Sequence, residues 1–317
     1  MDETMGQAVD QVVDQAVEKL PGTPTERLDL TDLVTRLRDL RTRALEERQR
    51  AHRPPRLPSR RTLATVIERL AAALFPYRLG LPDITDDGID AYVGHLLDVA
   101  LRELAGEIAR ELVCHQGLDA VAAKSAADQV MARFASTLPH IRQVLDTDIL
   151  AAFRGDPAAR SIDEVLVCYP GIAAVIHHRL AHELHTLGAP LCARIIAELA
   201  HTQTGIDIHP GARIAGSFFI DHGTGVVIGE TAIIGERVRL YHGVTLGAKR
   251  FPVDEDGTML KGGDRHPIVG DDVVIYAGAT ILGRIVIGHG SVIGGNAWLT
   301  QSVPPGSNVA QSQARQQ

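Results

Sequence analysis

The sequence predicts an α+β protein, with an N-terminal α-helical domain followed by a parallel β-helix built from six-residue repeats. Over residues 61–200, apolar residues recur at i, i+3 and i+4, as on one face of a helix, and glycine is sparse. From Gly205 onward, aliphatic residues stand on a six-residue grid, which is typical of a parallel β-helix. The 317 residues are 45% hydrophobic and 22% charged, so each domain can bury a core.

Residues 1–60 form a polar, charged extension. Its arginine-rich second half is broken by three prolines, which predicts a weakly packed helix or two and then a linker. The arginines fit a solvated helix face better than a nucleic-acid contact, because the whole chain has a net charge of −7 and no stacking-aromatic pattern. Residues 61–204 follow as the helical domain, with short breakers at 81–83 and 155–157.

The β-helix is expected over residues 205–305. Each hexad of such a fold supplies a short strand and a turn, and its aliphatic residue points inward onto a counterpart one coil away. A β-sandwich would show two-residue alternation instead. The grid contains one two-residue shift and is made of Ile208, Ile214, Ile220, Ile228, Ile234, Leu240, Leu246, Val269, Ile275, Ile281, Ile287, Ile293 and Leu299.

Two irregularities interrupt the grid, and each carries a histidine beside a charged residue. His222 follows Asp221 at the two-residue shift. His266 follows Arg265 at the end of a polar, glycine-containing stretch that must leave the coil as a loop. Because the pKa of histidine suits proton transfer near neutral pH, His222 and His266 are candidate functional residues. The other histidines of the repeat region fit solvated turns: His209, His242 and His289.

The cysteines and the N-terminus indicate a cytoplasmic protein. The three cysteines are odd in number and form no CxxC pair, which predicts reduced thiols. The acidic N-terminus lacks the features of a secretory signal, and no apolar run reaches the roughly 18–20 residues of a membrane span. Residues 306–317 are expected to be a flexible tail.

Several segments together resemble serine O-acetyltransferases. The likeness covers residues 150–305, and other hexapeptide acyltransferases share the repeat but lack the combination of DHGTG with GDRHP. It implies a left-handed β-helix that transfers acetyl from acetyl-CoA to the hydroxyl of L-serine, the first step of cysteine biosynthesis from serine. No tightly bound cofactor is expected. The matching segments are GDPAA (155–159), DIHPGA (207–212), FIDHGTGVVIGET (219–231), GVTLG (243–247) and GDRHP (263–267).

The resemblance also implies roles for single residues. His222 corresponds to the general base that deprotonates the serine hydroxyl, and Asp207 to the carboxylate that orients its imidazole. Arg265 and His266 correspond to groups that hold the substrate α-carboxylate, and guanidinium suits this role because it can pair with a carboxylate bidentately. The substrate α-ammonium is assigned to two carboxylates, Asp156 and Asp221.

Acetyl-CoA is expected along the β-helix, in a groove between neighbouring subunits. This implies a homotrimer, in which His222 and His266 face each other from different subunits, or a dimer of trimers joined by the helical domains. The family's CoA contacts correspond to Gly247, Ala248, Tyr276 and Ala277. On charge alone, Lys249 and Arg250 are candidates for the CoA phosphates.

Family members that dock into cysteine synthase use a flexible tail ending in isoleucine. This chain ends QARQQ, so we expect no such complex by that route. No nucleic-acid or membrane partner is expected. Feedback inhibition by L-cysteine is a further expectation, because cysteine offers the same ammonium and carboxylate as serine.

Other functions are compatible with the repeat. A hexapeptide acetyltransferase could act on a sugar, homoserine or an antibiotic hydroxyl, but Asp156, Asp221 and Arg265 suit a zwitterionic acceptor. A metal could lie between three histidines, as in the gamma-class carbonic anhydrases. That site favours an HxxxxH pair, whereas His242 follows His222 by 20 residues and His266 follows His242 by 24, so we predict no metal. A non-catalytic scaffold would not explain charged pairs at both breaks.

Overall fold

A computed structural model describes residues 30–47, 56–250, 256–259 and 262–310. The chain divides into two units, residues 1–54 and 55–317. The first contains helix α2 (Leu30–Glu47), whose Leu30, Leu33 and Leu40 side chains are exposed. Residues 1–29 and 48–55 of the predicted N-terminal extension, most of the predicted tail and part of the loop after Arg250 lie outside the described residues.

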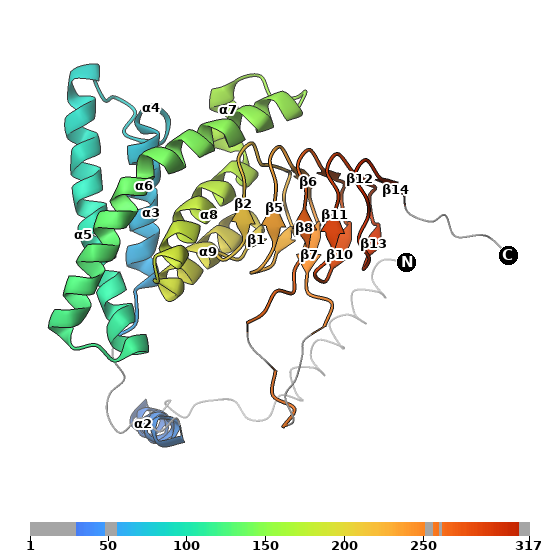
Figure 1. Ribbon diagram of the computed structural model, residues 1–317. Helices are drawn as coiled ribbons and strands as arrows, with labels where there is room; N and C mark the ends of the chain where they lie inside the picture. The colour runs from blue at the N-terminus through green and yellow to red at the C-terminus, as the bar shows by residue number, and fades with distance from the viewer. Residues whose placement is uncertain (1–29, 48–55, 251–255, 260–261, 311–317) are drawn as a thin grey trace, which may run out of the picture. The chain divides into compact units, whose positions relative to one another are not determined.

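The second unit begins with the predicted helical domain (Figure 1). Helix α3 packs against α5 and α9, α5 packs against α6, and α8 packs against α9. Among the described residues, none of the helices combines the length and apolar character needed to cross a membrane. The elements are α3 (Arg60–Leu74), α4 (Pro76–Leu79), the 3-10 helix η1 (Asp86–Gly88), α5 (Ile89–Gln116), α6 (Ala120–Gly155), α7 (Ile162–Cys168), α8 (Pro170–Thr186) and α9 (Pro190–Thr204).

Local sequence explains where several of these helices begin. The side chains of Ser59, Asp119 and Ser161 accept hydrogen bonds from backbone N–H groups in the first turns of α3, α6 and α7, respectively. Such caps satisfy donors that have no partner within the helix. Pro170 and Pro190 open α8 and α9, where a missing N–H costs nothing. The apolar periodicity predicted for α3 is confirmed by a buried face of Leu63, Val66, Ile67 and Leu70.

Residues 207–309 form the predicted parallel β-helix, with three sheets as its sides (Figure 1). Sheet A has the order β1-β4-β7-β10-β13, sheet B β11-β8-β5-β2, and sheet C β14-β12-β9-β6-β3. The strands are β1 (Asp207–Ile208), β2 (Arg213–Ile214), β3 (Phe219–Asp221), β4 (Val227–Ile228), β5 (Ile233–Ile234), β6 (Arg239–Tyr241), β7 (Thr245–Gly247), β8 (Ile268–Val269), β9 (Val274–Ile275), β10 (Thr280–Leu282), β11 (Val286–Ile287), β12 (Val292–Ile293), β13 (Trp298–Leu299) and β14 (Asn308–Val309).

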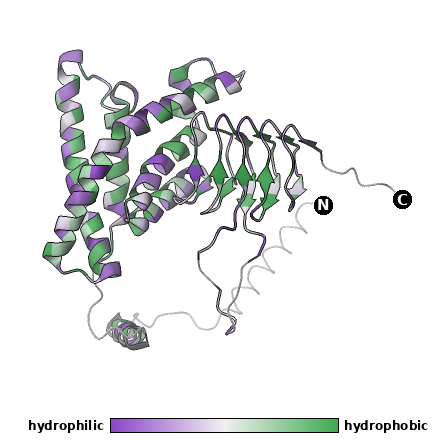
Figure 2. Ribbon diagram, viewed as in Figure 1, coloured by the Kyte–Doolittle hydropathy of each residue, from purple (hydrophilic) through white to green (hydrophobic). Residues whose placement is uncertain are grey.

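The predicted grid forms the core of the solenoid. All its members except Ile214 and Leu299, which are partly buried, are at most 4% exposed. A second inward row stands two residues before the grid and was not predicted, because several of its members are Ala or Ser. The grid residues lie within the strands and contribute to the hydrophobic colour of the strands in Figure 2. The second row includes Ala212, Phe218, Val226, Ala232, Val238, Val244, Val273, Ala279, Ser291 and Ala297.

The strand register locates both predicted irregularities. Regular coils repeat every 18 residues, as where Val227 pairs with Thr245. Asp207 pairs with Val227 at an interval of 20, because residues 222–225 lengthen the turn between sheets C and A. Thr245 pairs with Thr280 at an interval of 35, because the chain leaves the coil after β7 and returns at β8. We call the turns from sheet C to sheet A the CA corner (residues 222–225, 242–243 and 276–278) and those from A to B the AB corner (229–231, 248–250 and 283–284).

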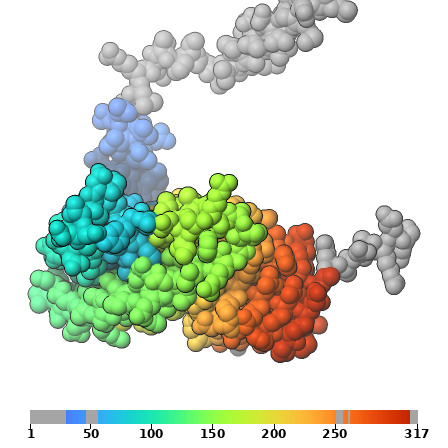
Figure 3. All heavy atoms as spheres, turned by 90° about the horizontal axis from the view of Figure 1, so that it is seen from above, coloured from blue at the N-terminus to red at the C-terminus, as the bar shows by residue number. Residues whose placement is uncertain are grey.

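A buried ion pair joins the helices to the first coil. Arg179 of α8 donates to Asp148 of α6, with Nε–Oδ2 at 2.6 Å and Nη2–Oδ1 at 2.8 Å. Arg179 also donates to the carbonyls of Ile214 and Ala215, and Asp148 accepts from the N–H of Phe218. Burial raises the pKa of Asp148, against the opposing effect of Arg179. The green helical region therefore packs directly on the orange coils in Figure 3.

Candidate active site

His222 lies at the CA corner with a positive φ of 59°. Its side chain is 72% exposed, and its Nε2 lies 3.9 Å from Oδ1 of Asp221. The His242 ring, one coil further on, meets it edge to face at 5.8 Å between centroids. Gly223, which follows with φ 87°, could not carry a side chain, because a β-carbon would lie 2.4 Å from Ile206. The two-residue insertion therefore presents His222 outward on a tightly packed turn.

Asp221 is already paired with a cation in this structure. Its Oδ2 accepts a hydrogen bond of 2.6 Å from Nη2 of Arg239, and both side chains are largely buried. The Arg239 guanidinium also lies over the rings of Phe219 and Tyr241. The Tyr241 ring stacks in turn on that of Tyr276, with centroids 5.0 Å apart. Beside His222, the corner thus carries a compact aromatic and charged cluster.

Asp156 follows α6 and belongs to the same part of the molecule. Its Oδ2 accepts a hydrogen bond of 2.5 Å from the Tyr169 hydroxyl, and its Oδ1 accepts one of 2.8 Å from the N–H of Ala158. The Tyr169 bond, followed by the Ala158 bond, lowers the pKa of Asp156, and the charges of Arg239 and His222 act in the same direction. The same Tyr169–Asp156 bond raises the pKa of Tyr169 to about 12.

Asp207 does not contact His222 in the part of the chain that the structure describes. Its carboxylate lies instead beside Glu198 and His201 of α9, and one ligand atom from each of these three residues lies within 4.8 Å of the others. Glu198 is also engaged by Arg194, with Nη2–Oε1 at 2.5 Å. The predicted orienting contact between Asp207 and the base is therefore not formed here, and the role of Asp207 stays a prediction.

His266 lies at the AB corner. Its Nδ1 accepts a hydrogen bond of 3.0 Å from the N–H of Thr231, so the neutral ring carries its proton on Nε2. Burial, together with the nearby Arg265 and Arg284 charges, lowers the pKa of His266 to about 4. The ring packs directly on Gly229, where a β-carbon would lie 2.0 Å from Cδ2. The result is a fixed, uncharged hydrogen-bond donor.

Arg265 and Arg284 surround this histidine. Nη2 of Arg265 donates to Oε2 of Glu230 at 2.5 Å, and this bond is the main cause of the lowered pKa of Glu230. Arg284, one coil further on, donates to the carbonyls of Thr231 and His266 at 2.6 and 3.0 Å. Two cationic side chains thus lie at this corner, and each is also paired with a carboxylate, Arg265 with Glu230 and Arg284 with Asp264.

The predicted CoA residues lie along both edges of sheet A. Gly247 ends β7, and its carbonyl accepts from the N–H of Gly283. Lys249 lies against Gly283, where a β-carbon would be 3.2 Å from Cβ of Lys249. At the other edge, the Ala277 carbonyl accepts from the N–H of Asn296. Gly247, Ala248, Lys249 and Arg250 are therefore near the AB corner, whereas Tyr276 and Ala277 belong to the CA corner.

The predicted site residues thus form two groups rather than one. Asp156, Asp221 and His222 gather at the CA corner, while Arg265 and His266 lie at the AB corner, on the opposite edge of sheet A. Sequence reasoning missed four residues that hold these groups through contacts between different coils or, for Tyr169, between the ends of two helices, for which the repeat gives no signal. They are Tyr169, Thr231, Arg239 and Arg284.

The other histidines of the repeat region differ from one another. His242 and His289 are exposed, as expected of turn residues. His209 is half-buried, with its Nδ1 accepting from the N–H of Gly211, and burial lowers its pKa to about 4. Its ring lies 6.0 Å from that of His185 on α8. The prediction of a solvated turn is therefore wrong for His209, because α8 covers it.

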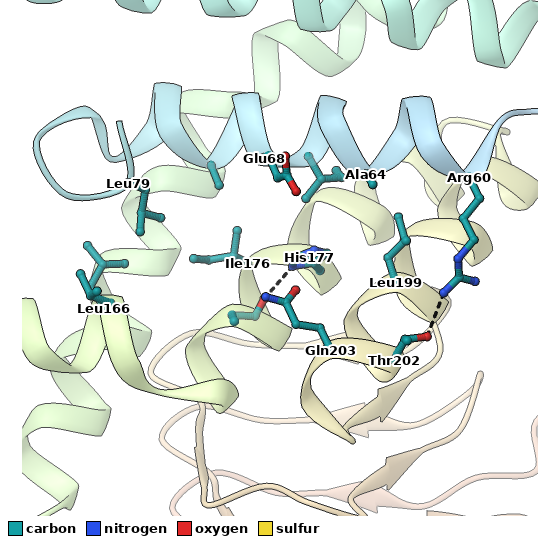
Figure 4. A pocket seen from close by; sticks show the side chains of 14 residues that line it. Arg60, Ala64, Glu68, Leu79, Leu166, Ile176, His177, Leu199, Thr202 and Gln203 are labelled. Atoms are coloured by element: carbon teal, nitrogen blue, oxygen red, sulfur yellow. Dashed lines mark hydrogen bonds between the residues drawn. The ribbon is translucent and has the colours of Figure 1, made fainter. Parts of the chain in front are cut away.

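A cavity of about 610 Å³ lies elsewhere, among α3, α7, α8 and α9 (Figure 4). Its walls are mainly aliphatic, and Arg60 at its rim donates to Thr202 at 2.8 Å. The ring of His177 is held by the carbonyl of Ala173. No predicted site residue lines this cavity, so it belongs to the helical domain rather than to the candidate active site.

Comparison with known proteins agrees with this architecture. Residues 266–301 match the family model "Bacterial transferase hexapeptide (six repeats)". The plasmid serine acetyltransferase of Synechococcus elongatus is 54% identical over 266 residues, which is 82% of this chain and 83% of the relative. Serine acetyltransferase of Mycobacterium tuberculosis is 54% identical over 162 residues, which is 51% of this chain and 67% of the relative.

Solved structures give the same result. Entamoeba histolytica serine acetyltransferase 1 in complex with L-cysteine has a TM-score of 0.67 and 40% identity, covering 78% of this chain and 86% of that one. Neisseria gonorrhoeae serine acetyltransferase in complex with serine has a TM-score of 0.52 and 30% identity, covering 80% of this chain and 96% of that one. Since the likeness to the Synechococcus relative extends over most of both proteins, the chain belongs to the serine acetyltransferase family.

Proposed function

We propose that this chain transfers the acetyl group of acetyl-CoA directly to the hydroxyl of L-serine, with His222 as the general base. The observation that carries the proposal is the CA corner, where an exposed imidazole stands beside two carboxylates, Asp221 and Asp156. An amino-acid substrate presents an ammonium group close to its hydroxyl. The carboxylates would attract the ammonium and thereby deliver the hydroxyl to His222.

In the proposed step, His222 takes the proton of serine Oγ while Oγ forms a bond to the thioester carbonyl carbon. Backbone N–H groups stabilise the resulting oxyanion. The tetrahedral intermediate collapses, the C–S bond breaks, and the imidazolium of His222 returns its proton to the sulfur. The products are O-acetyl-L-serine and CoA. Because the thioester is already activated, the reaction needs no covalent enzyme intermediate and no tightly bound cofactor.

The substrate carboxylate would bind to Arg265 and to the Nε2–H of His266. Because these groups lie across sheet A from His222, we propose that the complete site forms between copies of the chain in a homotrimer. CoA would then run along the groove between subunits, past Gly247 and Tyr276, with Lys249 and Arg250 available to its phosphates. Closed rotational symmetry repeats such an interface at every subunit boundary.

The remaining proposals concern the cell. The chain would work in the cytoplasm without a nucleic-acid or membrane partner. The helical domains could join two trimers. L-cysteine would compete for the same ammonium and carboxylate groups, as the L-cysteine complex of the Entamoeba relative suggests.

The direct test is release of free CoA from acetyl-CoA by purified protein, with and without L-serine. The His222→Ala variant should lose about 10²–10⁴-fold in kcat, the usual range for a general base. The matched control is His289→Ala, because His289 is also an exposed corner histidine of the solenoid. Serine-dependent release that survives in His222→Ala would exclude this residue as the base. No serine-dependent release from the folded wild type would reject the proposed acceptor.

A further inference from the structure

Arg239 is a charged residue that contacts the proposed ammonium site and has no role in the mechanism described above. It lies on β6, and its guanidinium lies over two aromatic rings, 4.9 Å from the centroid of Phe219 and 4.6 Å from that of Tyr241. Nη2 donates to Oδ2 of Asp221 at 2.6 Å. The Arg239 side chain is 24% exposed and that of Asp221 is 11% exposed, so solvent screens this pair only weakly.

The same guanidinium also approaches the segment that carries the second carboxylate. A β-carbon on Gly155 would lie 2.9 Å from the Phe219 ring and 3.7 Å from Nη1 of Arg239. Gly155 directly precedes Asp156, and the Arg239 charge helps to lower the pKa of Asp156. Arg239 therefore lies between the end of α6 and strand β3, the two elements that supply the carboxylates.

Packing alone does not explain a charged residue at this position. The Nε–H of Arg239 is buried and has no hydrogen-bond partner among the described residues. An unsatisfied buried donor is unfavourable, and methionine could fill a similar space without one. The positive charge at this position therefore has a role other than stabilising the fold.

Charge balance indicates that function. Asp156 and Asp221 contribute two negative charges and Arg239 contributes one positive charge, which leaves a single net negative charge beside His222. L-serine brings a single ammonium group. We propose that Arg239 is a positioning residue of the ammonium site: it fixes the Asp221 carboxylate and leaves one carboxylate charge for the substrate. This inference rests on the proposed function of the CA corner.

The test compares Arg239→Met, Arg239→Lys and the control Arg237→Met. Arg237 lies two residues earlier and pairs with Asp272 in an exposed bidentate contact, so the control removes an arginine from the same coil. Each protein is titrated with L-serine by calorimetry in the absence of acetyl-CoA, and steady-state kinetics and the melting temperature are also measured.

For Arg239→Met, we expect the Kd and KM for L-serine to rise about tenfold, because the Asp221 carboxylate is no longer held in place for the ammonium group. The KM for acetyl-CoA should stay close to wild type, whereas the melting temperature should fall, because Asp221 is left largely buried without its counter-ion. Arg239→Lys should recover part of the serine affinity, and Arg237→Met should match wild type. As the pH is lowered, Arg239→Met should lose serine affinity at a higher pH than wild type does. The reason is that one charge that lowers the pKa of Asp156 is gone.

Unchanged serine binding in Arg239→Met would overturn the inference. Equal increases in both KM values would also overturn it, by showing a merely structural role. The binding measurement separates this inference from the proposed function. A wild-type protein that binds L-serine without releasing CoA would refute the reaction but leave the Arg239 effect measurable, whereas no serine binding would refute both.

Discussion

The His266 imidazole lies against the α-carbon of Gly229, so closely that a β-carbon there would be 2.0 Å from Cδ2 and 2.1 Å from Nε2. The φ of Gly229 is not in the left-handed region, so alanine meets no backbone strain at this position. The three atoms nearest to that β-carbon all belong to the His266 ring. Residue 229 therefore determines whether His266 can keep its place over the coil.

Gly229→Ala should displace His266 and raise the KM for L-serine about tenfold or more, equivalent to at least ~1.4 kcal/mol of binding free energy. Steady-state kinetics at several serine concentrations will measure this. Gly106→Ala is the control, because a β-carbon there meets nothing within 4 Å. Wild-type KM in Gly229→Ala would mean that His266 does not contact the substrate.

Subunit mixing tests whether the site forms between copies of the chain. His222→Ala and His266→Ala should each be nearly inactive, but their co-expression should restore about a quarter of wild-type activity. In a ring with random mixing, that fraction of interfaces combines an intact His222 with an intact His266. If both histidines of a site come from one chain, mixing will restore nothing.

Tyr169→Phe should change the pH dependence of serine use. The Tyr169 hydroxyl is the first cause of the lowered pKa of Asp156, so its removal raises that pKa. The proposed ammonium contact needs a charged Asp156. As the pH is lowered, kcat/KM for serine should therefore begin to fall at a higher pH in Tyr169→Phe than in wild type. Tyr77→Phe is the control, since Tyr77 bonds Asp86 on the exposed surface. Superimposable pH profiles would argue against Asp156 as the ammonium partner.

Asp148→Ala should destabilise the protein by about 3–5 kcal/mol, because it leaves Arg179 buried without its counter-ion. Urea unfolding followed by circular dichroism will report the loss. Asp272→Ala removes the partner of an exposed arginine and should cost much less, because solvent screens that pair. Equal, small effects of the two changes would show that the buried pair does not secure the helices to the first coil.

L-cysteine should inhibit competitively with L-serine, and 3-mercaptopropionate, which lacks the ammonium group, should inhibit much less. The reason is the proposed pair of binding groups, with carboxylates at one end and Arg265 with His266 at the other. Initial rates at varied serine and inhibitor concentrations will distinguish the patterns. An inhibition curve that stays flat to millimolar L-cysteine would contradict the prediction.

The sequence predicted the solenoid because its core depends on an interval that repeats. Ile228, Leu246 and Ile281 stack in adjacent coils of sheet A, and each stands on the six-residue grid. The second inward row was not predicted, because small or polar members such as Ala232 and Ser291 weaken its apolar pattern, although the coil buries both. The breaks were visible as departures from the interval, and both carry candidate residues.

The site was less predictable, because its contacts join segments that no interval relates. Arg239 pairs with Asp221 from an adjacent strand, and Tyr169 reaches Asp156 from the end of α7. Nothing in the local sequence marks either partner. Asp207 shows the opposite case: family resemblance pairs it with His222, whereas the described contacts place it beside His201 of α9.

The long interval at β7 has a consequence for how this protein can diversify. Strands on both sides of the excursion remain in register, with Ile233 paired to Ile268 and Thr245 paired to Thr280. The coil therefore closes whatever length of chain is inserted there, and doubling that length costs only about 0.6 kcal/mol of closure entropy. We therefore expect insertions and deletions to be tolerated at this point. The segment beside His266 can therefore vary in length and sequence during evolution while the solenoid stays the same.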